Sequence, residues 1–358
     1  MTDKQTGEDM QKTETDNAGG GLRGLRARPS AELFEAVHLS YGIQRLEDSI
    51  DLGGSSSLNL LVTDDHSRYV VRVYRPYVTE ARLADIRLAR QELSTRGVPS
   101  SEVILTLDGQ QWIVFDGRLI EVERYVESDA QMDSWERLMV GLPILGRIHT
   151  ILRDLSFSTE GRKPLFANHI DSQAALSMTL QGTQRIRMWG PSSGNLRLAD
   201  AAEELAHLVS AGERELVPML PRQVVHGDYW DNNVFFLGGR VLLVADFDFM
   251  GERARIDDLA LTLYYFGCSD EPVSDKQLGS LRSLIDAYDE GLDEHLSITE
   301  RKALPFAMAR QPLWSIGGWI ALLDDEEAAL RHAASMLAEV EWALRIVREL
   351  DRWQAAFT

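Results

Sequence analysis

Cysteine, long apolar runs and positive charge are all scarce in this 358-residue sequence. The single cysteine, Cys268, excludes an internal disulfide and is typical of a reducing compartment. The first residues contain no apolar stretch of the kind that forms a signal peptide. The most apolar late segment, 305–323, is interrupted by Arg310, Pro312 and Gly317, which argues against a membrane span. We therefore expect a cytoplasmic protein that does not enter a membrane.

Positive charge is scarce because 37 lysines and arginines stand against 56 aspartates and glutamates, giving a formal net charge of −19. No basic patch offsets this acidity, so nucleic acid is not an expected partner. An acidic cleft would attract a cationic small molecule, whereas the same residues could serve solubility alone. Both interpretations stay open, and the oligomeric state is not determined by the sequence.

The length of the chain predicts two lobes, because single hydrophobic cores usually stop growing below this size. Residues 1–28 include a run of three glycines and almost no large apolar side chains, which predicts a flexible segment. Residues 29–127 contain five strand-like segments around one helix that follows Thr79. Residues 128–358 are mainly helical. The expected fold class is α+β, a protein kinase-like arrangement of a small antiparallel lobe and a larger helical lobe.

The helical lobe is divided by its hydrophobic periodicity and by its turn residues. The only clear strands in it flank Gly238 and Gly239. The predicted helices cover 132–154, 171–187, 197–216, 256–267, 274–293, 299–323 and 325–354.

One segment carries most of the chemical information. It reads His-Gly-Asp at 226–228, then Asn233 after four intervening residues, and an Asp-Phe pair at 246–247. A kinase catalytic loop and metal-binding segment have the same layout. The reaction needs one carboxylate at the attacking hydroxyl, and an amide and a second carboxylate at the magnesium ion. Mg²⁺ takes few protein oxygens, so one Asn and one Asp suffice.

The stretch between the two parts explains the spacing. Two apolar runs, 234–237 and 240–244, flank the Gly238-Gly239 pair, which predicts a β-hairpin. A tight hairpin would place Asn233 and Asp246 at neighbouring strand ends, where both could face one ion. Each residue alone could merely cap a turn. The combination at this spacing favours a phosphotransferase.

These motifs resemble those of the aminoglycoside phosphotransferase and choline kinase-like superfamily, which includes homoserine kinase-type and stress-response kinase-type members. The His-Gly-Asp loop is the most specific match, and Leu-Gly-Arg-Ile-His at 145–149 is similar to the family's Leu-Gly-x-Leu-His. Asp-Leu-Ala at 258–260 matches the family pattern, and the Gly-Ser stretch at 53–59 is similar to its nucleotide loop. The resemblance covers roughly 45–340.

The resemblance implies roles for the residues around the hairpin. Asp228 would orient, and help to deprotonate, the acceptor hydroxyl, while Asn233 and Asp246 would bind Mg²⁺. His226 is expected to brace the loop. Asp248 is expected to cap a turn, with a second magnesium as the alternative. Two further residues are expected to have structural roles, Asp258 at the start of a helix and His149 in the core.

Nucleotide binding is expected in the small lobe. Arg72 stands where the family usually has a phosphate-binding lysine, and its forked guanidinium can bridge phosphate oxygens. Its acidic partner on the following helix is expected to be Asp85, with Glu80 and Glu92 as alternatives. The remaining nucleotide contacts are assigned to the glycine loop and to the end of the last strand, at Gly54, Ser55, Ser56, Tyr125 and Val126.

Acceptor recognition is expected in the helical lobe. Trp230 lies in the catalytic loop and could stack on the acceptor. Arg310 and Trp314 are four residues apart and could share a helix face. For Trp319 core packing is the preferred interpretation.

The leading functional prediction is a kinase that uses ATP and Mg²⁺ to phosphorylate a hydroxyl of a small, amine-bearing molecule. Aminoglycoside-like antibiotics, homoserine-like amino alcohols, choline and sugars stay open as acceptors, and so does GTP as donor. One alternative is a protein Ser/Thr kinase of the stress-response type, disfavoured by the short segment 249–256. A nucleotide-binding pseudokinase is a second alternative, disfavoured by the intact Asp228, Asn233 and Asp246.

Overall fold

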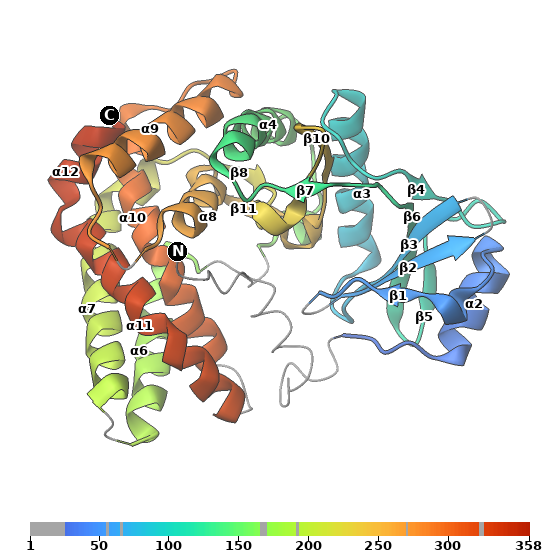
Figure 1. Cartoon of the computed structure of the whole chain (residues 1–358), viewed down its shortest axis with the longest axis horizontal. Helices are drawn as coiled ribbons and strands as arrows, with labels where there is room; N and C mark the ends of the chain where they lie inside the picture. Colours follow the sequence, from blue (N-terminus) through green and yellow to red (C-terminus); the bar gives the residue numbers. More distant parts are fainter. Residues whose placement is uncertain are drawn as a thin grey trace. The chain divides into compact units, whose positions relative to one another are not determined.

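The computed structural model describes residues 26–358 except 55–56, 65–66, 165–169, 191–192, 270 and 322–325. Contacts divide the chain into two compact units (Figure 1). The N-terminal unit is the described part of Met1–Ala84 together with Ser101–Glu127, and the C-terminal unit is Asp85–Ser100 with Ser128–Thr358. Across the described residues, no helix has the length and apolar character that a bilayer crossing requires.

The N-terminal unit is built on one antiparallel sheet with the order β1-β2-β3-β6-β4, in which β5 also pairs with β6. Asp116 and Gly117 have φ values of 49° and 70°, the pattern of a two-residue turn between β5 and β6. The sheet has one short strand more than predicted. Its strands are β1 (Ile50–Asp51), β2 (Leu58–Asp64), β3 (Ser67–Val73), β4 (Val103–Ile104), β5 (Ile113–Phe115) and β6 (Arg118–Arg124).

Helix α2 (Ala31–Tyr41) covers one face of this sheet (Figure 1). Ser30 caps the helix, because its side chain accepts a hydrogen bond from the N–H of Leu33. Leu33 and Val37 point inward and pack with the buried residues of β2, β3 and β6. This packing forms the core of the unit.

Helix α3 (Glu80–Thr95) begins in the N-terminal unit and continues in the C-terminal unit. Thr79 accepts a hydrogen bond from the N–H of Arg82, which confirms the predicted start. Gly97, with φ +78°, follows the helix end. Ile86 and other apolar residues of its second half are buried in the core of the C-terminal unit.

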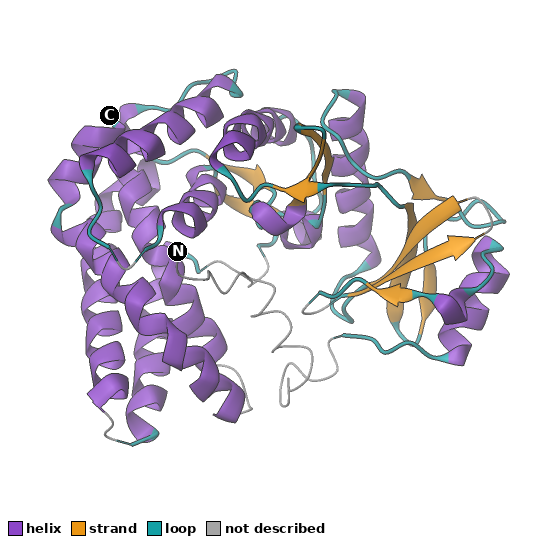
Figure 2. Cartoon of the chain, viewed as in Figure 1, coloured by secondary structure: helices purple, strands orange, loops and turns teal. Residues whose placement is uncertain are grey.

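The C-terminal unit is mainly helical, with small sheets among its helices (Figure 2). The predicted α+β class is therefore confirmed. Its α-helices are α4 (Trp135–Arg153), α5 (Thr159–Arg162), α6 (Ser172–Met188), α7 (Ser193–Leu216), α8 (Ile256–Gly267), α9 (Asp275–Glu290), α10 (Ile298–Trp314), α11 (Glu326–Arg348) and α12 (Leu350–Phe357). Its strands are β7 (Ala130–Gln131), β8 (Arg222–Val225), β9 (Val234–Leu237), β10 (Arg240–Val244) and β11 (Gly251–Ala254).

Several features of this unit differ from the sequence-based expectation, among them β7 and α5, which were not predicted. The predicted helix 299–323 changes after α10 into a π-helical turn, Ser315–Ile320. The predicted helix 325–354 is interrupted at Glu349 between α11 and α12. Strands β8 and β11 were not predicted, because each has only four residues and its partner lies far away in the sequence. Their pairing matters, since β8 leads directly into His226.

Candidate active site

The hairpin of β9 and β10 brings the two predicted metal ligands together. Gly238 and Gly239 have φ values of 57° and 78°, as a two-residue turn of this type requires. At the open end of the hairpin the N–H of Ala245 donates to the carbonyl of Asn233 at 2.9 Å. Asp246 is the next residue, so its backbone lies beside that of Asn233.

Asn233 is also bound to the predicted catalytic carboxylate. Its Nδ2 donates to the backbone carbonyl of Asp228 at 2.8 Å and to Oδ2 of the same residue at 2.9 Å. Both bonds use the amide nitrogen, which leaves the oxygen, Oδ1, as the atom that can ligate a cation. Asp228 and Asn233 are both buried.

The donor set around Asn233 and Asp246 fits a magnesium ion that is bound together with phosphate. Among the described residues there is no group of three or more His, Cys, Asp or Glu side chains that could hold a metal. Mg²⁺ does not need one, since it commonly takes one or two protein oxygens and fills its other positions with water and phosphate oxygens. An amide oxygen and a carboxylate on adjacent backbone satisfy this requirement.

Asp246 has an unusual backbone conformation. Its φ of 63° and ψ of 62° lie in the left-handed region, which residues with a side chain seldom occupy. Such conformations cost of the order of 1–3 kcal/mol and cluster at functional sites. The following turn, Phe247–Phe249, contains Asp248, which is 2% exposed. Asp248 therefore lies inside the structure next to the candidate site.

His226 braces the loop from within. Its Nε2 donates to the carbonyl of Ala245 at 2.9 Å, and its Nδ1 accepts the N–H of Asp228 at 3.2 Å. This pattern requires a neutral ring with the proton on Nε2. Burial lowers the pKa of His226, against the opposing charges of Asp258 and Asp246. The ring therefore joins the catalytic loop to the end of the hairpin.

Gly227 fits a space that no other residue can occupy. Its φ is +83°, and a Cβ placed there would lie 2.2 Å from the carbonyl oxygen of Phe249. The N–H of Gly227 donates to the carboxylate of Asp258, at 2.9 Å to Oδ1 and 3.2 Å to Oδ2. The tight packing of Gly227 on Phe249 and its hydrogen bond to Asp258 therefore hold the loop between the 247–249 turn and α8.

A buried relay fixes Asp258 in turn. His149 contacts Oδ2 of Asp258 through Nε2 at 3.1 Å, and its Nδ1 lies 2.7 Å from the hydroxyl of Tyr288. Burial alone would raise the pKa of Asp258, but hydrogen bonding and charge from His149, with help from His226 and Arg253, hold it below its usual value. Burial raises the pKa of Tyr288, so its hydroxyl stays protonated and donates. The prediction that His149 is a hydrogen-bonded core residue is confirmed.

Helix α8 also fixes the residues that follow Asp228. The hydroxyl of Thr262 donates to the carbonyl of Tyr229 at 2.6 Å. The ring of Trp230 stacks on Tyr265, with centroids 4.6 Å apart. The hydroxyl of Tyr229 donates to the carbonyl of Gly141 on α4 at 2.7 Å. The loop is thus anchored to two helices.

Several of these anchoring residues could not be assigned from the sequence. Tyr288 is 139 positions from His149, and Thr262 is 33 positions from Tyr229. Neither lies in a recognisable motif. The sequence offered one signal of this support, an acidic residue at the start of α8. The structural role of Asp258 was predicted from that signal.

In the N-terminal unit, the glycine loop before β2 is closed by Asn59. Its Nδ2 donates to the carbonyl of Gly53 at 3.1 Å. Gly54 has φ +114°, and a Cβ there would lie 3.0 Å from Asn59 Nδ2. Arg26 Nε donates to the carbonyl of Gly54 at 2.9 Å. Two further residues assigned to this loop lie outside the described residues, Ser55 and Ser56.

Arg72 and Asp85 belong to different units. Arg72 of β3 lies opposite Glu121 of β6 in the register of the two strands. Its guanidinium lies 5.2 Å from the ring centroid of Tyr74. Asp85 Oδ2 accepts hydrogen bonds from the N–H and hydroxyl of Ser158, at 3.0 and 2.5 Å. These two hydrogen bonds between Asp85 and Ser158 hold α3 within the C-terminal unit. Pairing of Arg72 with Asp85 stays a prediction.

The segment assigned to adenine follows β6. The N–H of Tyr125 donates to the carbonyl of Arg68 at 2.9 Å, and the guanidinium of Arg68 lies 4.5 Å from the ring centroid of Tyr125. Tyr125 therefore continues the sheet, and Val126 is the first residue beyond it, with partial exposure.

Arg310 has surroundings that differ from the expected acceptor contact. It is 3% exposed, with Nη2 at 2.6 Å from Asp257 and Nε at 3.3 Å from Glu213. Its Nη1 donates to the carbonyl of Ile170 at 3.1 Å. These contacts describe a buried ion-pair cluster. The half-buried ring of Trp314 lies 5.8 Å from that of Trp319.

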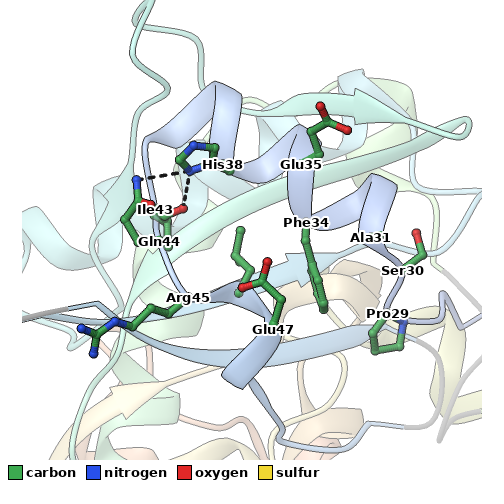
Figure 3. Close-up of a pocket in the computed structure, with 11 residues that line it drawn as sticks. Pro29, Ser30, Ala31, Phe34, Glu35, His38, Ile43, Gln44, Arg45 and Glu47 are labelled. Carbon is green, nitrogen blue, oxygen red and sulfur yellow. Dashed lines mark hydrogen bonds between the residues drawn. The ribbon is translucent and has the colours of Figure 1, made fainter.

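A separate groove of about 600 Å³ lies in the N-terminal unit, between α2 and residues 43–47 (Figure 3). His38 Nδ1 is 2.9 Å from the carbonyl of Ile43 and 3.4 Å from Nε2 of Gln44. None of its lining residues is among those assigned to nucleotide, metal or acceptor.

The chain is similar to known kinases in sequence. A homoserine kinase of Zymomonas mobilis subsp. mobilis is 24% identical over 61% of this chain and 64% of that protein, so the match spans less than two thirds of its length. A homoserine kinase of Rhodopseudomonas palustris (strain HaA2) is 26% identical over 77% of this chain and 80% of that protein.

Solved structures show the same fold. A microcompartment-associated aminopropanol kinase has a TM-score of 0.67 at 17% identity, covering 90% of this chain and 98% of that one. An amicoumacin kinase in complex with AMP-PNP, Ca²⁺ and Ami has a TM-score of 0.62 at 15% identity, covering 87% and 93%. The predicted kinase-like fold is confirmed by these likenesses.

The Phosphotransferase enzyme family model matches residues 49–302, which is more than half of the chain. The match includes the His-Gly-Asp loop, the hairpin and the start of α8. It confirms the predicted class of small-molecule phosphotransferase at the level of the family. Because this model covers more than half of the chain, the chain belongs to the phosphotransferase enzyme family.

Proposed function

We propose that this protein is an ATP- and Mg²⁺-dependent kinase that phosphorylates a hydroxyl group of a small, amine-bearing molecule. The observation that carries the proposal is the connection of Asp228, Asn233 and Asp246 at the open end of one hairpin. Phosphoryl transfer is catalysed mainly by positioning and by charge stabilisation. A fixed carboxylate beside two metal ligands supplies both.

Asp228 is the proposed catalytic residue. Its carboxylate is held by the amide of Asn233, and its N–H is held by His226. In this position it orients the acceptor hydroxyl and accepts its proton as the bond to phosphorus forms. The rigid bracing keeps the carboxylate in one orientation before the acceptor arrives.

Asn233 Oδ1 and the Asp246 carboxylate are the proposed ligands of Mg²⁺. The ion, when bound, neutralises phosphate charge and orients the transferred group. The left-handed backbone at Asp246 supports this role, since such strain is retained where a side chain must be aimed. The amicoumacin kinase in complex with AMP-PNP and Ca²⁺ supports nucleotide and divalent-ion use in this fold.

Nucleotide contacts are proposed for the N-terminal unit. Arg72 would bind phosphate oxygens, the loop at Gly54 would approach the phosphates with its backbone, and Tyr125 and Val126 would flank adenine. The closed loop supports this arrangement, because Gly54 has no side chain to hinder a close approach.

An amine-bearing acceptor is supported by the names of the relatives and neighbours. Homoserine kinases and an aminopropanol kinase act on molecules that carry both a hydroxyl and an amine. The net charge of −19 would attract such a cation.

The proposal is tested by an acceptor screen. The wild-type chain is incubated with ATP, Mg²⁺ and a panel of amino alcohols, aminoglycosides and neutral sugars, and ADP release and phosphorylated product are measured. We expect acceptor-dependent product with the wild type and none with Asp228→Ala. Nucleotide binding should survive in that variant. Phosphate on added proteins, or turnover retained in Asp228→Ala, would refute the proposal.

A further inference from the structure

Beyond Asp228, the catalytic loop continues into an aromatic pair that Trp230 forms with Tyr265 of α8. Trp230 stacks on Tyr265 with ring planes 28° apart. Tyr265 is 39% exposed and Trp230 is half-buried. The buried Nε1 of Trp230 has no hydrogen-bond partner in the part of the chain that the structure describes. An aromatic surface and an unused N–H donor thus stand two residues from the catalytic carboxylate.

Helix α8 connects this pair to a carboxyl group on α11. The ring of Tyr264 lies 5.2 Å from that of Tyr265, and its hydroxyl donates to Oε2 of Glu339. Thr262, on the same helix, holds the carbonyl of Tyr229. The aromatic pair and Glu339 are therefore positioned by the helix that anchors the catalytic loop.

Glu339 has no cationic partner among the described residues. Within the part of the chain that the structure describes, its one polar contact is Tyr264, and burial raises the pKa of its carboxyl group to about 7. A half-buried carboxylate normally has a cation or several donors. On α11 and the helices packed against it, four arginines contact other groups: Arg310 contacts Asp257 and Glu213, Arg197 contacts Glu341, Arg348 contacts Glu204, and Arg345 donates to the carbonyl of Ser269.

We propose that Glu339 and the Trp230–Tyr265 pair form a subsite, the ammonium subsite, that binds the cationic group of the acceptor. A cation would gain from the carboxylate charge and from the aromatic faces together. The N–H of Trp230 would donate to an oxygen of the same molecule. The acceptor is then an amino alcohol with its hydroxyl at Asp228 and its ammonium at Glu339. This inference rests on the proposed transfer to a hydroxyl group.

The subsite couples acceptor binding to a proton. A cation beside Glu339 favours the ionised carboxylate. Because burial sets the pKa of the free group near 7, part of the population is protonated at neutral pH. An ammonium group that binds there displaces this proton to the solvent. Amine affinity should therefore fall as the pH falls below about 7, while a neutral alcohol of the same shape should show no such change.

The test is calorimetric titration of the full chain with 1-amino-2-propanol, homoserine and the neutral 2-butanol. Titrations at about pH 6 and about pH 8, in two buffers of different ionisation heat, report the proton released. The variant is Glu339→Gln, which copies the protonated form and should fold. The matched control is Glu341→Gln, an exposed carboxylate on the same helix that pairs with Arg197.

We expect Glu339→Gln to weaken amine binding about tenfold or more, as for a lost charged hydrogen bond, and to abolish proton release. Glu341→Gln should bind within about twofold of the wild type. Tyr265→Leu, which leaves Glu339 in place, should weaken amine binding by about threefold or more. Thermal unfolding of each variant establishes that it is folded.

Unchanged amine affinity in folded Glu339→Gln, or equal wild-type affinity for amines and 2-butanol, overturns the ammonium subsite. If Glu339→Gln does not fold, wild-type amine binding without proton release overturns it equally. The proposed function fails separately. It fails if the wild type transfers phosphate to no alcohol, amine-bearing or neutral, and it survives if phosphate transfer is seen while the amine binding of Glu339→Gln is unchanged.

Discussion

The catalytic loop and the ammonium subsite share the segment around Trp230 but differ in how their polar groups are satisfied. In the loop, the N–H groups of Gly227 and Asp228 and the amide of Asn233 all have acceptors inside the protein. In the subsite, the buried N–H of Trp230 has none, and Glu339 has a single partner among the described residues. Reactive groups are thus held by the protein alone, whereas recognition groups await a ligand.

The largest expected effect breaks the bracing of the loop at Asp258. Asp258→Ala removes the acceptor of the Gly227 N–H and the partner of His149, both buried. Loss of one partner from a buried charged pair costs about 3–5 kcal/mol of unfolding free energy. Chemical denaturation measures it. Asp275→Ala, which breaks an exposed pair with Arg352, is the control and should cost less than about 1 kcal/mol. Equal losses would contradict the bracing.

A second change tests the close approach at Gly227. Gly227→Ala places a Cβ 2.2 Å from the carbonyl oxygen of Phe249, in addition to the penalty of φ +83°. We expect a loss of about 3 kcal/mol or more in unfolding free energy, and a fall in turnover. Gly239→Ala is a matched control, because its φ is +78° and nothing lies within 4 Å of its Cβ. It should cost about 1 kcal/mol. Similar costs would show that contact with Phe249 is unimportant.

Glu213 is a third case to compare with the catalytic loop and the ammonium subsite, because it is a buried carboxyl group with one oxygen that lacks a hydrogen bond in the described part of the chain. Its Oε2 has no hydrogen-bond partner among the described residues, and burial raises its pKa to about 7, against the opposing charge of Arg310. Because the pKa of Glu213 is higher in the folded than in the unfolded chain, protonation of Glu213 stabilises the folded protein. This contribution is complete below about pH 4.5 and is lost as the pH rises through about 7.

Glu213→Gln should therefore remove part of the pH dependence of unfolding. Above pH 7 the variant should be more stable than the wild type by up to about 3 kcal/mol, and the advantage should vanish as the pH falls below about 4.5. Denaturation midpoints across this range measure the difference. A variant that is less stable than the wild type at pH 8 would mean that Arg310 requires the charge of Glu213.

The smallest effect is expected at the far end of the relay. Tyr288→Phe removes the hydroxyl that donates to His149 and leaves the ring in place. The cost should be about 1 kcal/mol. Turnover should fall more than acceptor affinity, because the relay positions the catalytic loop and does not touch the ammonium subsite. A larger change in acceptor KM than in kcat would contradict the proposed difference in role between the catalytic loop and the ammonium subsite.

The catalytic hairpin could be predicted because its information is local. Two glycines with positive φ and the spacing from Asn233 to Asp246 lie within one short segment. The short strands β8 and β11, by contrast, depend on residues about 30 positions apart, and no periodicity reveals four-residue strands. Sequence patterns therefore predicted the hairpin that brings Asn233 and Asp246 together and missed part of its support.

The recognition residues follow the same rule. Trp230 was chosen because it lies inside the catalytic motif. Glu339 lies 75 positions from its partner Tyr264, in a helix whose pattern marks it only as one polar residue among many. Arg310 had the spacing of an acceptor contact, yet the fold buries it against Asp257 and Glu213. Asp85 was likewise chosen from its place on the helix that follows Arg72, and its observed partner, Ser158, is 73 positions away.

The most direct test of the central claim is the Mg²⁺ dependence of nucleotide affinity in Asp246→Asn. If Asp246 and Asn233 hold the ion on the phosphates, nucleotide should bind the wild type more tightly as Mg²⁺ is added, and this gain should be lost in Asp246→Asn. Asp275→Asn, an exposed control, should keep it. An Asp246→Asn chain with the Mg²⁺ dependence of the wild type would contradict the account.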